Sequence, residues 1–144
     1  MERVRLEFPE ADVRHRHGLT VRVTDMNYGR HLGHDAVVSL MHEARVQALA
    51  SLGLSEGDME GYLCVVADLA VQYQAESRWP DALMIETAIP APSRKSIADY
   101  HRLRRESDDR SVATARLNLM LIDPDTGRPA PVPATLADRL MGND

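Results

Sequence analysis

The segment Arg22-Val-Thr-Asp-Met-Asn-Tyr-Gly-Arg-His-Leu-Gly-His-Asp-Ala-Val-Val-Ser-Leu-Met-His-Glu-Ala-Arg45 decides how this chain is expected to fold. Apolar and polar side chains alternate from Leu19 to Thr24, which predicts a strand leading into it. A polar turn around Asn27 and Gly29 follows. From about Asp35 to Leu52 the apolar residues return every three or four positions, which predicts an amphipathic helix.

Both ends of the predicted helix carry local signals. Gly53 is expected to be a left-handed residue after the last turn, with apolar Leu54 packing back against the helix. At the start, Asp35 meets the positive end of the helix dipole. The first N–H groups of a helix have no partner within it, so a ligand oxygen is expected to find donors near Leu32, Gly33 and His34.

After the helix, the spacing of apolar residues changes to that of strands. Four long strands separated by short connectors are expected, at Tyr62 to Glu76, Ala82 to Ile89, Lys95 to Arg105 and Ser111 to Ile122. A short helix is expected from about Ala134 to Met141, and the alternation of Val4, Leu6 and Phe8 indicates a short edge strand. Short connectors permit antiparallel pairing, so the long helix should pack on an antiparallel sheet that curls around it.

The strand from Tyr62 to Glu76 is apolar on both faces, with Leu63, Val65, Ala67, Leu69, Val71 and Tyr73 expected to share one of them. The helix can bury only one of these two apolar faces, so we expect a second copy of the chain to bury the other in a homo-oligomer. Asp68 interrupts the apolar residues of the other face. Because a charge there is costly unless it is paired or faces a cleft, Asp68 is a candidate substrate-binding residue.

Bulk properties exclude several classes of protein. The 144 residues fit one domain, 1–144, and the net charge of −5 speaks against a nucleic-acid binder. No stretch approaches the roughly 20 apolar residues of a membrane span. The single cysteine, Cys64, lies among apolar residues, as expected for an inert buried thiol. The single cysteine and the absence of a signal peptide together predict a cytoplasmic protein.

The chain resembles the hotdog-fold acyl-CoA thioesterases of the 4-hydroxybenzoyl-CoA thioesterase type. That family's motif has a strand ending in Asp-x-Asp, a Gly-His or similar pair, and a helix carrying Glu-Ala-Arg. Here Arg22 to Asp25, His31 and Glu43-Ala44-Arg45 stand at matching spacing. The resemblance covers almost the whole chain and implies an α+β hotdog fold, in which a curved antiparallel sheet of five to six strands wraps around a long central helix.

The resemblance also implies an activity. Relatives of this kind hydrolyse an acyl-CoA thioester without a cofactor, at active sites between the subunits of dimers or tetramers. The thioester carbonyl would lie at the N-terminus of the helix, and a carboxylate would attack it or activate water. The expected partners are therefore an acyl-CoA substrate and further copies of this chain, in a homodimer or homotetramer.

One departure from the motif affects the mechanism. Where the second Asp of Asp-x-Asp is catalytic in the family, this chain has Asn27, and an amide cannot take a proton as a general base. Arg30 also replaces the Gly that precedes the family's His. A thioesterase mechanism would therefore need another carboxylate, and the candidates are Glu43 and Asp35.

The resulting hypothesis is hydrolysis of an acyl-CoA or acyl-carrier thioester to free acid and thiol. Asn27 would hold a water molecule, Glu43 or Asp35 would activate it, and His31 would polarise the carbonyl or shuttle a proton. The N–H groups of Gly33 and His34 would bind the carbonyl oxygen. His31, His34 and Asp35 do not have the spacing of a metal site.

Two alternatives stay open at this stage. A hotdog dehydratase or hydratase would use His31 with an acid to add or remove water at the acyl chain. A non-catalytic acyl-CoA-binding protein would account for the amide at position 27. Asp35 and Glu43 also have simple structural interpretations, as a residue that stabilises the helix start and as a solvated helix residue.

Overall fold

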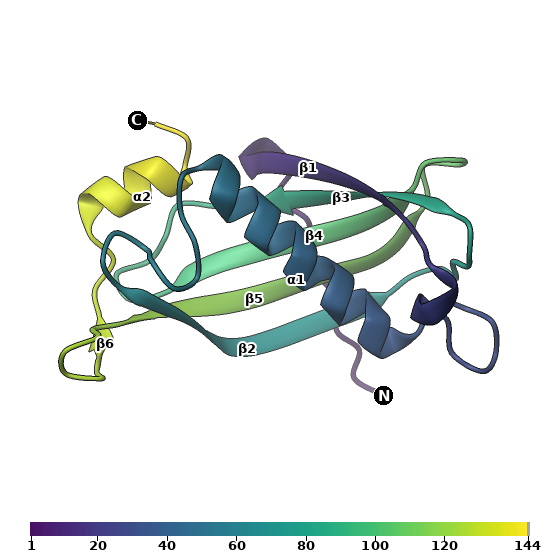
Figure 1. The fold of residues 1–144 in the computed structure, drawn as a ribbon, viewed down its shortest axis with the longest axis horizontal. Helices are drawn as coiled ribbons and strands as arrows, with labels where there is room; N and C mark the ends of the chain where they lie inside the picture. The colour runs from purple at the N-terminus through teal and green to yellow at the C-terminus, as the bar shows by residue number, and fades with distance from the viewer. Residues whose placement is uncertain (144) are drawn as a thin grey trace.

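The computed structural model describes residues 1–143, and its dominant feature is the helix α1 (His34–Ser51) lying across one face of a curved sheet (Figure 1). Every strand pair is antiparallel, and the strand order across the sheet is β1-β3-β4-β5-β2, with β6 added beside β5. The strands are β1 (Val13–Thr20), β2 (Leu63–Tyr73), β3 (Ala82–Ala88), β4 (Ile97–Arg105), β5 (Ser111–Ile122) and β6 (Pro129–Ala130). The expected helix on an antiparallel sheet is confirmed.

The ends of α1 agree with the local signals in the sequence. Gly53 has φ +74°, and the backbone N–H of Leu54 donates to the carbonyl of Leu49 at 2.9 Å, which closes the last turn. At the other end Gly33 is the N-cap residue and offers no side chain to the first turn. The short helix α2 (Ala134–Leu140) also forms where it is expected.

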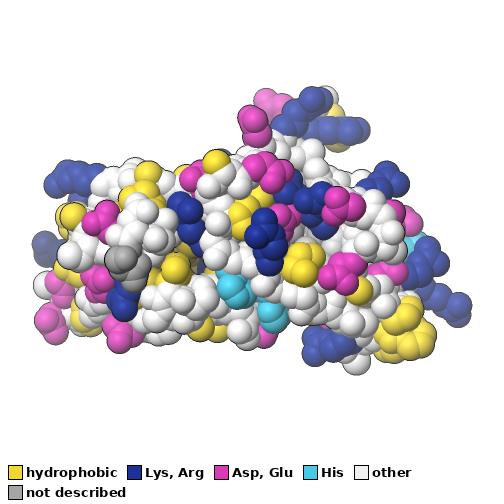
Figure 2. Space-filling model, turned by 90° about the horizontal axis from the view of Figure 1, so that it is seen from above, with side chains coloured by type: hydrophobic (Ala, Val, Ile, Leu, Met, Phe, Trp, Pro, Cys, Tyr) yellow, Lys and Arg dark blue, Asp and Glu magenta, His cyan; other side chains and the backbone are white. Residues whose placement is uncertain are grey.

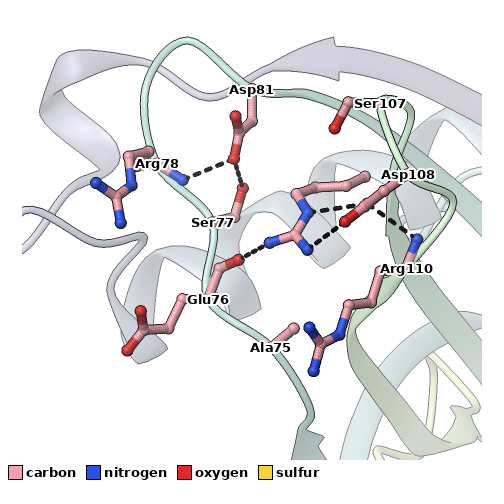
Figure 3. A pocket seen from close by; sticks show the side chains of 9 residues that line it. Ala75, Glu76, Ser77, Arg78, Asp81, Ser107, Asp108 and Arg110 are labelled. Carbon is pink, nitrogen blue, oxygen red and sulfur yellow. Dashed lines mark hydrogen bonds and ion pairs between the residues drawn. The ribbon is translucent and has the colours of Figure 1, made fainter.

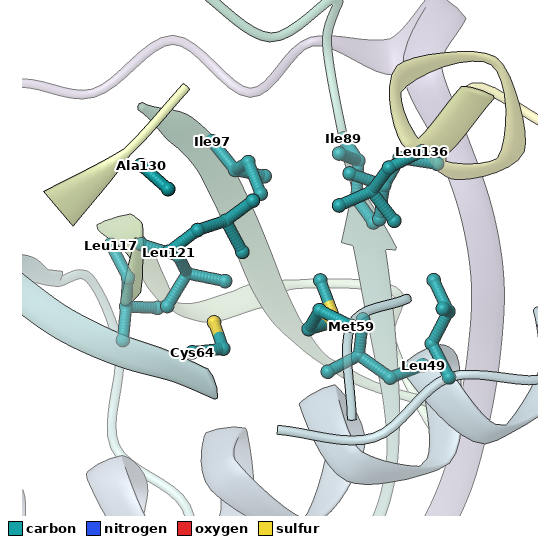
Figure 4. Packing of buried hydrophobic residues seen from close by; sticks show 12 residues of the cluster. Leu49, Met59, Cys64, Ile89, Ile97, Leu117, Leu121, Ala130 and Leu136 are labelled. Carbon is teal, nitrogen blue, oxygen red and sulfur yellow. The ribbon is translucent and has the colours of Figure 1, made fainter. Parts of the chain in front are cut away.

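The core lies between α1 and the sheet. One face of α1 buries the apolar residues Val37, Leu40, Met41, Ala44, Ala48 and Leu49. Near the C-terminal end of α1, Leu49 and Leu136 of α2 pack with Ile97, Leu117 and Leu121 of the sheet (Figure 4). Burial of each large apolar side chain contributes about 1.5–3 kcal/mol, so this packing holds α1 in place over the sheet.

The first strand differs from the expectation. β1 occupies Val13–Thr20, and residues 23–25 form a turn of 3-10 helix instead of continuing the strand. His15 and His17 occupy core-facing positions of β1, opposite buried residues of β3. Because these two positions are not apolar, the sequence of β1 does not show the alternation typical of a strand. Beyond β1 the chain turns away from the sheet, and there the backbone N–H of Arg22 donates to Oδ2 of Asp25 at 2.8 Å.

The two faces of β2 also differ from the expectation. Val66 pairs with Leu119 and Asp68 with Asn118, so Ala67 is an extra residue in a β-bulge. Opposite residues in a ladder share a face, so the bulge puts Val66 on the same side as Leu69, the side that faces α1. A strictly alternating pattern therefore assigns the first half of the strand to the wrong face.

The N-terminal residues do not form the expected short edge strand. They cross the side of the sheet opposite α1, where the N–H of Leu6 donates to Oε1 of Gln72 at 3.1 Å. Phe8 is buried, with the guanidinium of Arg102 4.2 Å from its ring centroid. Side-chain contacts, and not a backbone ladder, hold this segment on the sheet.

Candidate active site

A tight turn around Asn27 precedes the N-terminus of α1. The side-chain oxygen of Asn27 accepts hydrogen bonds from the N–H groups of Gly29 at 3.0 Å and His31 at 3.3 Å. The backbone N–H of Asn27 donates to the carbonyl of His31 at 2.8 Å, and Arg30 has φ +64°. Because the amide oxygen is occupied, the NH₂ group is the part of Asn27 that can bind a ligand, as a donor.

The N-terminus of α1 offers donors that differ from the expected ones. The N–H of Leu32 donates to the carbonyl of Ser77 at 2.7 Å, and that of Gly33 donates to the carbonyl of Asp25 at 3.0 Å. Of the three expected donors only His34 therefore has a free N–H. Within residues 1–143, the N–H groups without an acceptor at this helix end are those of His34, Asp35 and Ala36. Such N–H groups at the positive end of a helix can stabilise a developing oxyanion.

Gly33 lies between Asp35 and Asn27. A Cβ atom built on Gly33 would be 2.6 Å from Oδ1 of Asp35 and 3.8 Å from Cβ of Asn27. The two side chains therefore flank the N-cap residue, and the absence of a side chain at Gly33 leaves space for the Asp35 carboxylate. The structure brings Asn27, Gly33, His34 and Asp35 together, as the sequence suggested.

Asp25 holds the turn before α1 in place. Its carboxylate is buried and accepts the backbone N–H of Arg22 at 2.8 Å and the guanidinium of Arg22 at 2.9 and 3.2 Å. Burial by itself would raise the pKa of Asp25, but the hydrogen bonds from Arg22 outweigh it and hold the pKa below its usual range. Asp25 is thus ionised and fixes the turn.

His31 contacts two side chains from the loop between β2 and β3. Its Nε2 lies 3.1 Å from Oε2 of Glu76 and 3.3 Å from Nη2 of Arg78. Tyr73, at the end of β2, donates its hydroxyl to the carbonyl of His34 at 3.0 Å. Sequence reasoning missed Glu76, because nothing in the pattern relates the end of a predicted strand to a turn so far back in the chain.

Glu43 lies away from this cluster. It is nine residues beyond His34 on α1, which is about 13 Å at about 1.5 Å per residue. It accepts a hydrogen bond from Nε2 of Gln47 at 3.1 Å and lines a groove of about 390 Å³ between β1 and α1, with His17 on the opposite wall. A carbonyl oxygen bound by the free N–H groups is therefore out of reach of Glu43 in the same chain.

Asp68 is not part of the cluster either. It pairs across the ladder with Asn118, whose side-chain NH₂ donates to Oδ1 of Asp68 at 2.8 Å. The neighbouring residues of β5, Leu117 and Leu119, are buried beneath α1, so Asn118 and Asp68 lie on the other face of the sheet. The charge at Asp68 is exposed and hydrogen-bonded, which explains why β2 tolerates it.

A polar pocket of about 580 Å³ adjoins the cluster, between the β2–β3 loop and the β4–β5 hairpin (Figure 3). Glu76 and Arg78, the two contacts of His31, both line it. Arg105 donates to the carbonyl of Glu76 and pairs with Asp108 at 2.6 Å. Within the loop, Asp81 accepts from the hydroxyl of Ser77 at 2.8 Å and from the N–H of Arg78 at 3.0 Å.

Other chemistries find less support in the described residues. Burial raises the pKa of Cys64 to about 11, so this thiol is not a ready nucleophile at neutral pH. Residues 1–143 contain no group of three or more His, Cys, Asp or Glu side chains positioned to hold a metal ion. None of the helices in that range is long and apolar enough to cross a membrane. Acidic and basic side chains are interspersed on the face shown in Figure 2.

The fold and the site together define a class of protein, the hotdog fold, in which a curved antiparallel sheet wraps one long helix. The family model of the thioesterase-like superfamily matches residues 21–140, and the chain belongs to this superfamily. No curated protein sequence matches the chain.

Solved structures with the same fold cover most of the chain. A Staphylococcus aureus hypothetical protein in complex with CoA has a TM-score of 0.80 at 18% identity, over 91% of this chain and 83% of that one. The DHNA-CoA thioesterase of the same organism has a TM-score of 0.71 at 23% identity, over 81% and 78%. An Asp-to-Asn mutant of 4-hydroxybenzoyl-CoA thioesterase, complexed with 4-hydroxybenzoyl-CoA, has a TM-score of 0.76 at 19% identity, over 87% and 96%.

Proposed function

We propose that this protein hydrolyses an acyl-CoA thioester to a free acid and CoA, with the thioester carbonyl at the N-terminus of α1. The observation that carries the proposal is the set of unpaired backbone N–H groups at His34, Asp35 and Ala36, beside the NH₂ group of Asn27. Donors held at fixed positions stabilise the negative charge that develops on the carbonyl oxygen when water attacks. Family membership and the CoA complexes of similar folds support this reaction.

The attacking water needs hydrogen-bond acceptors, and the cluster offers two. Asp35 and His31 lie two residues to either side of Gly33 in the sequence, and we propose each as an acceptor for an O–H group of the water. A carboxylate and a neutral imidazole each have a basic lone pair that can accept a proton, unlike the amide of Asn27. In this arrangement Asn27 donates to the carbonyl oxygen and does not hold the water, because its own oxygen is already bonded to Gly29 and His31.

A second copy of the chain is part of the proposal. β2 is an edge strand that pairs with β5 on one side only. Its α1-facing residues Val66, Leu69 and Tyr73 are 45, 41 and 52% exposed, which is unusual for a strand beside the core. A copy packed along β2 would cover them, and it would lie next to Tyr73, which contacts His34. We therefore propose that the protein forms a homodimer, or a homotetramer built from such dimers. We also propose a cytoplasmic location, because the single cysteine is a free thiol.

The second candidate function is an acyl-CoA-binding protein without turnover. The observation that favours it is Asn27, which stands where some relatives carry a catalytic Asp and whose oxygen is bonded within the turn. Such a protein would use the same donors to bind the carbonyl but would release no thiol.

The experiment that tests the proposal is release of free thiol from a panel of acyl-CoA esters, from short to long aliphatic chains and one aryl ester. We expect at least one ester to be hydrolysed well above the rate without protein. The exposed carboxylate of Asp138 on α2 provides a control, because Asp138→Asn should leave the rate unchanged. Saturable binding of an ester, measured by calorimetry, without thiol release would favour the binding protein.

A further inference from the structure

We infer that Glu76 is a positioning residue, which orients the imidazole of His31 so that its Nδ1 takes the proton from the attacking water. The inference rests on the proposed thioester hydrolysis and names the group that acts as its general base. Asn27 stands where the family motif has its second Asp, so the motif lacks a carboxylate there. Glu76 supplies a carboxylate from a loop outside the motif.

We assign the proton of His31 to Nε2 on the shorter of its two contacts, the one with Glu76, because the guanidinium of Arg78 can only donate and would favour the other tautomer. Nε2 of His31 is 3.1 Å from Oε2 of Glu76, a distance suited to an N–H donor and a carboxylate acceptor. Nδ1 makes no hydrogen bond to any residue in the described range 1–143. With the proton on Nε2, the lone pair of Nδ1 is available, and a carboxylate on the other nitrogen stabilises the imidazolium that forms.

The side chain of Glu76 is 72% exposed, and the backbone around it holds it beside His31. Leu32 follows His31 and Ser77 follows Glu76, and the N–H of Leu32 donates to the carbonyl of Ser77 at 2.7 Å. Ser77 is 2% exposed and bonds to Asp81, and Arg105 donates to the carbonyl of Glu76. The loop that carries Glu76 is therefore fixed against the turn that carries His31.

Arg78 acts on His31 in the opposite sense to Glu76. Its Nη2 lies 3.3 Å from the same Nε2, and a positive charge there disfavours the imidazolium. The other charged groups near the ring are Arg30, on the same turn, and Asp35, in the first turn of α1; neither contacts the imidazole. Glu76 and Arg78 thus form a matched pair with opposite predicted effects on proton uptake by His31.

The proposed step uses only the thioester, one water molecule and the imidazole of His31. Nδ1 of His31 takes one proton from water while the water oxygen forms a bond to the thioester carbon. The carbon–sulfur bond then breaks, the electron pair leaves with sulfur, and the thiolate takes the proton from the imidazolium. The products are the free acid and the thiol, and His31 is neutral again.

The test compares Glu76→Gln, Glu76→Asp and Arg78→Gln with the wild type by kcat across pH. Glu76→Gln should lower kcat between about 10-fold and 10⁴-fold and move the acidic limb of the profile to lower pH, because the imidazole loses a neighbouring negative charge. Glu76→Asp keeps a carboxylate and should therefore retain most of the wild-type kcat. Arg78→Gln should move the limb to higher pH, and the exposed Glu106→Gln should change nothing.

A second measurement separates this inference from the proposed function. Nitrogen NMR of His31 in the free protein should show the proton on Nε2 in the wild type and a loss of that preference in Glu76→Gln. Wild-type hydrolysis with an unmoved limb in Glu76→Gln would overturn the inference and leave the function intact. An Nε2-protonated His31 in a protein that releases no thiol would instead overturn the function, and with it the base role of His31.

Discussion

Oδ1 of Asp35 lies 2.6 Å from the point that a Cβ atom on Gly33 would occupy. Real Cβ atoms do not approach other heavy atoms so closely, so any side chain at position 33 must displace this carboxylate. The backbone of Gly33 itself is ordinary, with φ −68° and ψ 148°. What fixes glycine at this N-cap is therefore the position of Asp35, and not a backbone conformation that only glycine adopts.

Gly33→Ala should accordingly lower activity while the protein stays folded. The flexible Asp35 side chain can move away at little cost, so the free energy of unfolding should change by less than about 1 kcal/mol. Turnover should fall by about 10-fold or more, because the water loses an acceptor beside the free N–H groups. Thiol release and thermal unfolding would be measured with Gly57→Ala as the control, since nothing lies within 4 Å of a Cβ there. Unchanged turnover in Gly33→Ala would show that Asp35 has no part in the reaction.

Asn27→Asp should reduce activity even though some relatives carry a catalytic Asp in the motif. The Asp oxygen can keep the hydrogen bonds from Gly29 and His31, so the turn survives. The NH₂ donor, however, becomes a negatively charged oxygen beside the developing oxyanion. We expect kcat to fall by about 10²–10³-fold, the usual effect of losing one such donor. An increase in kcat would mean that position 27 acts as a base site and that Asn27 limits turnover.

The ion pair of Asp25 with Arg22 should make stability depend on pH in the acidic range. Because the pKa of Asp25 is lowered in the folded protein, its contribution is fully present above the unfolded value of about 3.9 and is lost as pH falls through the folded value. Asp25→Asn should therefore cost about 1–3 kcal/mol at pH 7, and the difference from wild type should shrink below about pH 4. Urea unfolding at several pH values measures this. A difference that is the same at pH 7 and pH 3 would contradict the assignment.

A charge on the exposed edge strand should separate the proposed homodimer. Leu69 lies on the α1-facing side of β2 and is 41% exposed in the single chain, so Leu69→Lys would place an ammonium in the interface without disturbing the core. Light scattering should show a dimer for the wild type and a monomer for the variant. Val23→Lys, at an exposed apolar residue outside the sheet, serves as the control. A wild-type monomer would overturn the proposed homodimer, and a dimeric Leu69→Lys would place the interface elsewhere.

The elements with one clear apolar period could be predicted from the sequence. Helix α1 falls within one residue of its predicted start and end, and β5 has its predicted bounds. β1 could not be placed correctly because His15 and His17 occupy core-facing positions, and the bulge at Ala67 changes the face of β2 without any signal in its composition. Buried polar residues such as Asp99 and His101 on β4 were equally invisible to the pattern.

The candidate site was predictable only where it is local in sequence. Asn27, Gly33, His34 and Asp35 belong to one turn and the helix that follows it, and the structure keeps them together. Glu76 comes from another loop, and its contact with His31 depends on tertiary packing that no local pattern encodes. Glu43 and Asp68 were proposed on residue type, but helical rise separates the first from the cluster and the sheet separates the second.

The most direct test of the central claim, that the reacting carbonyl lies at the N-terminus of α1, is a comparison of Asp35→Asn with Glu43→Gln. The measurement is kcat for thiol release from the best ester of the panel. We predict that Glu43→Gln stays within about threefold of the wild type and that Asp35→Asn loses about 10-fold or more. Loss of turnover in Glu43→Gln with full activity in Asp35→Asn would contradict this account and place the reaction in the groove between β1 and α1.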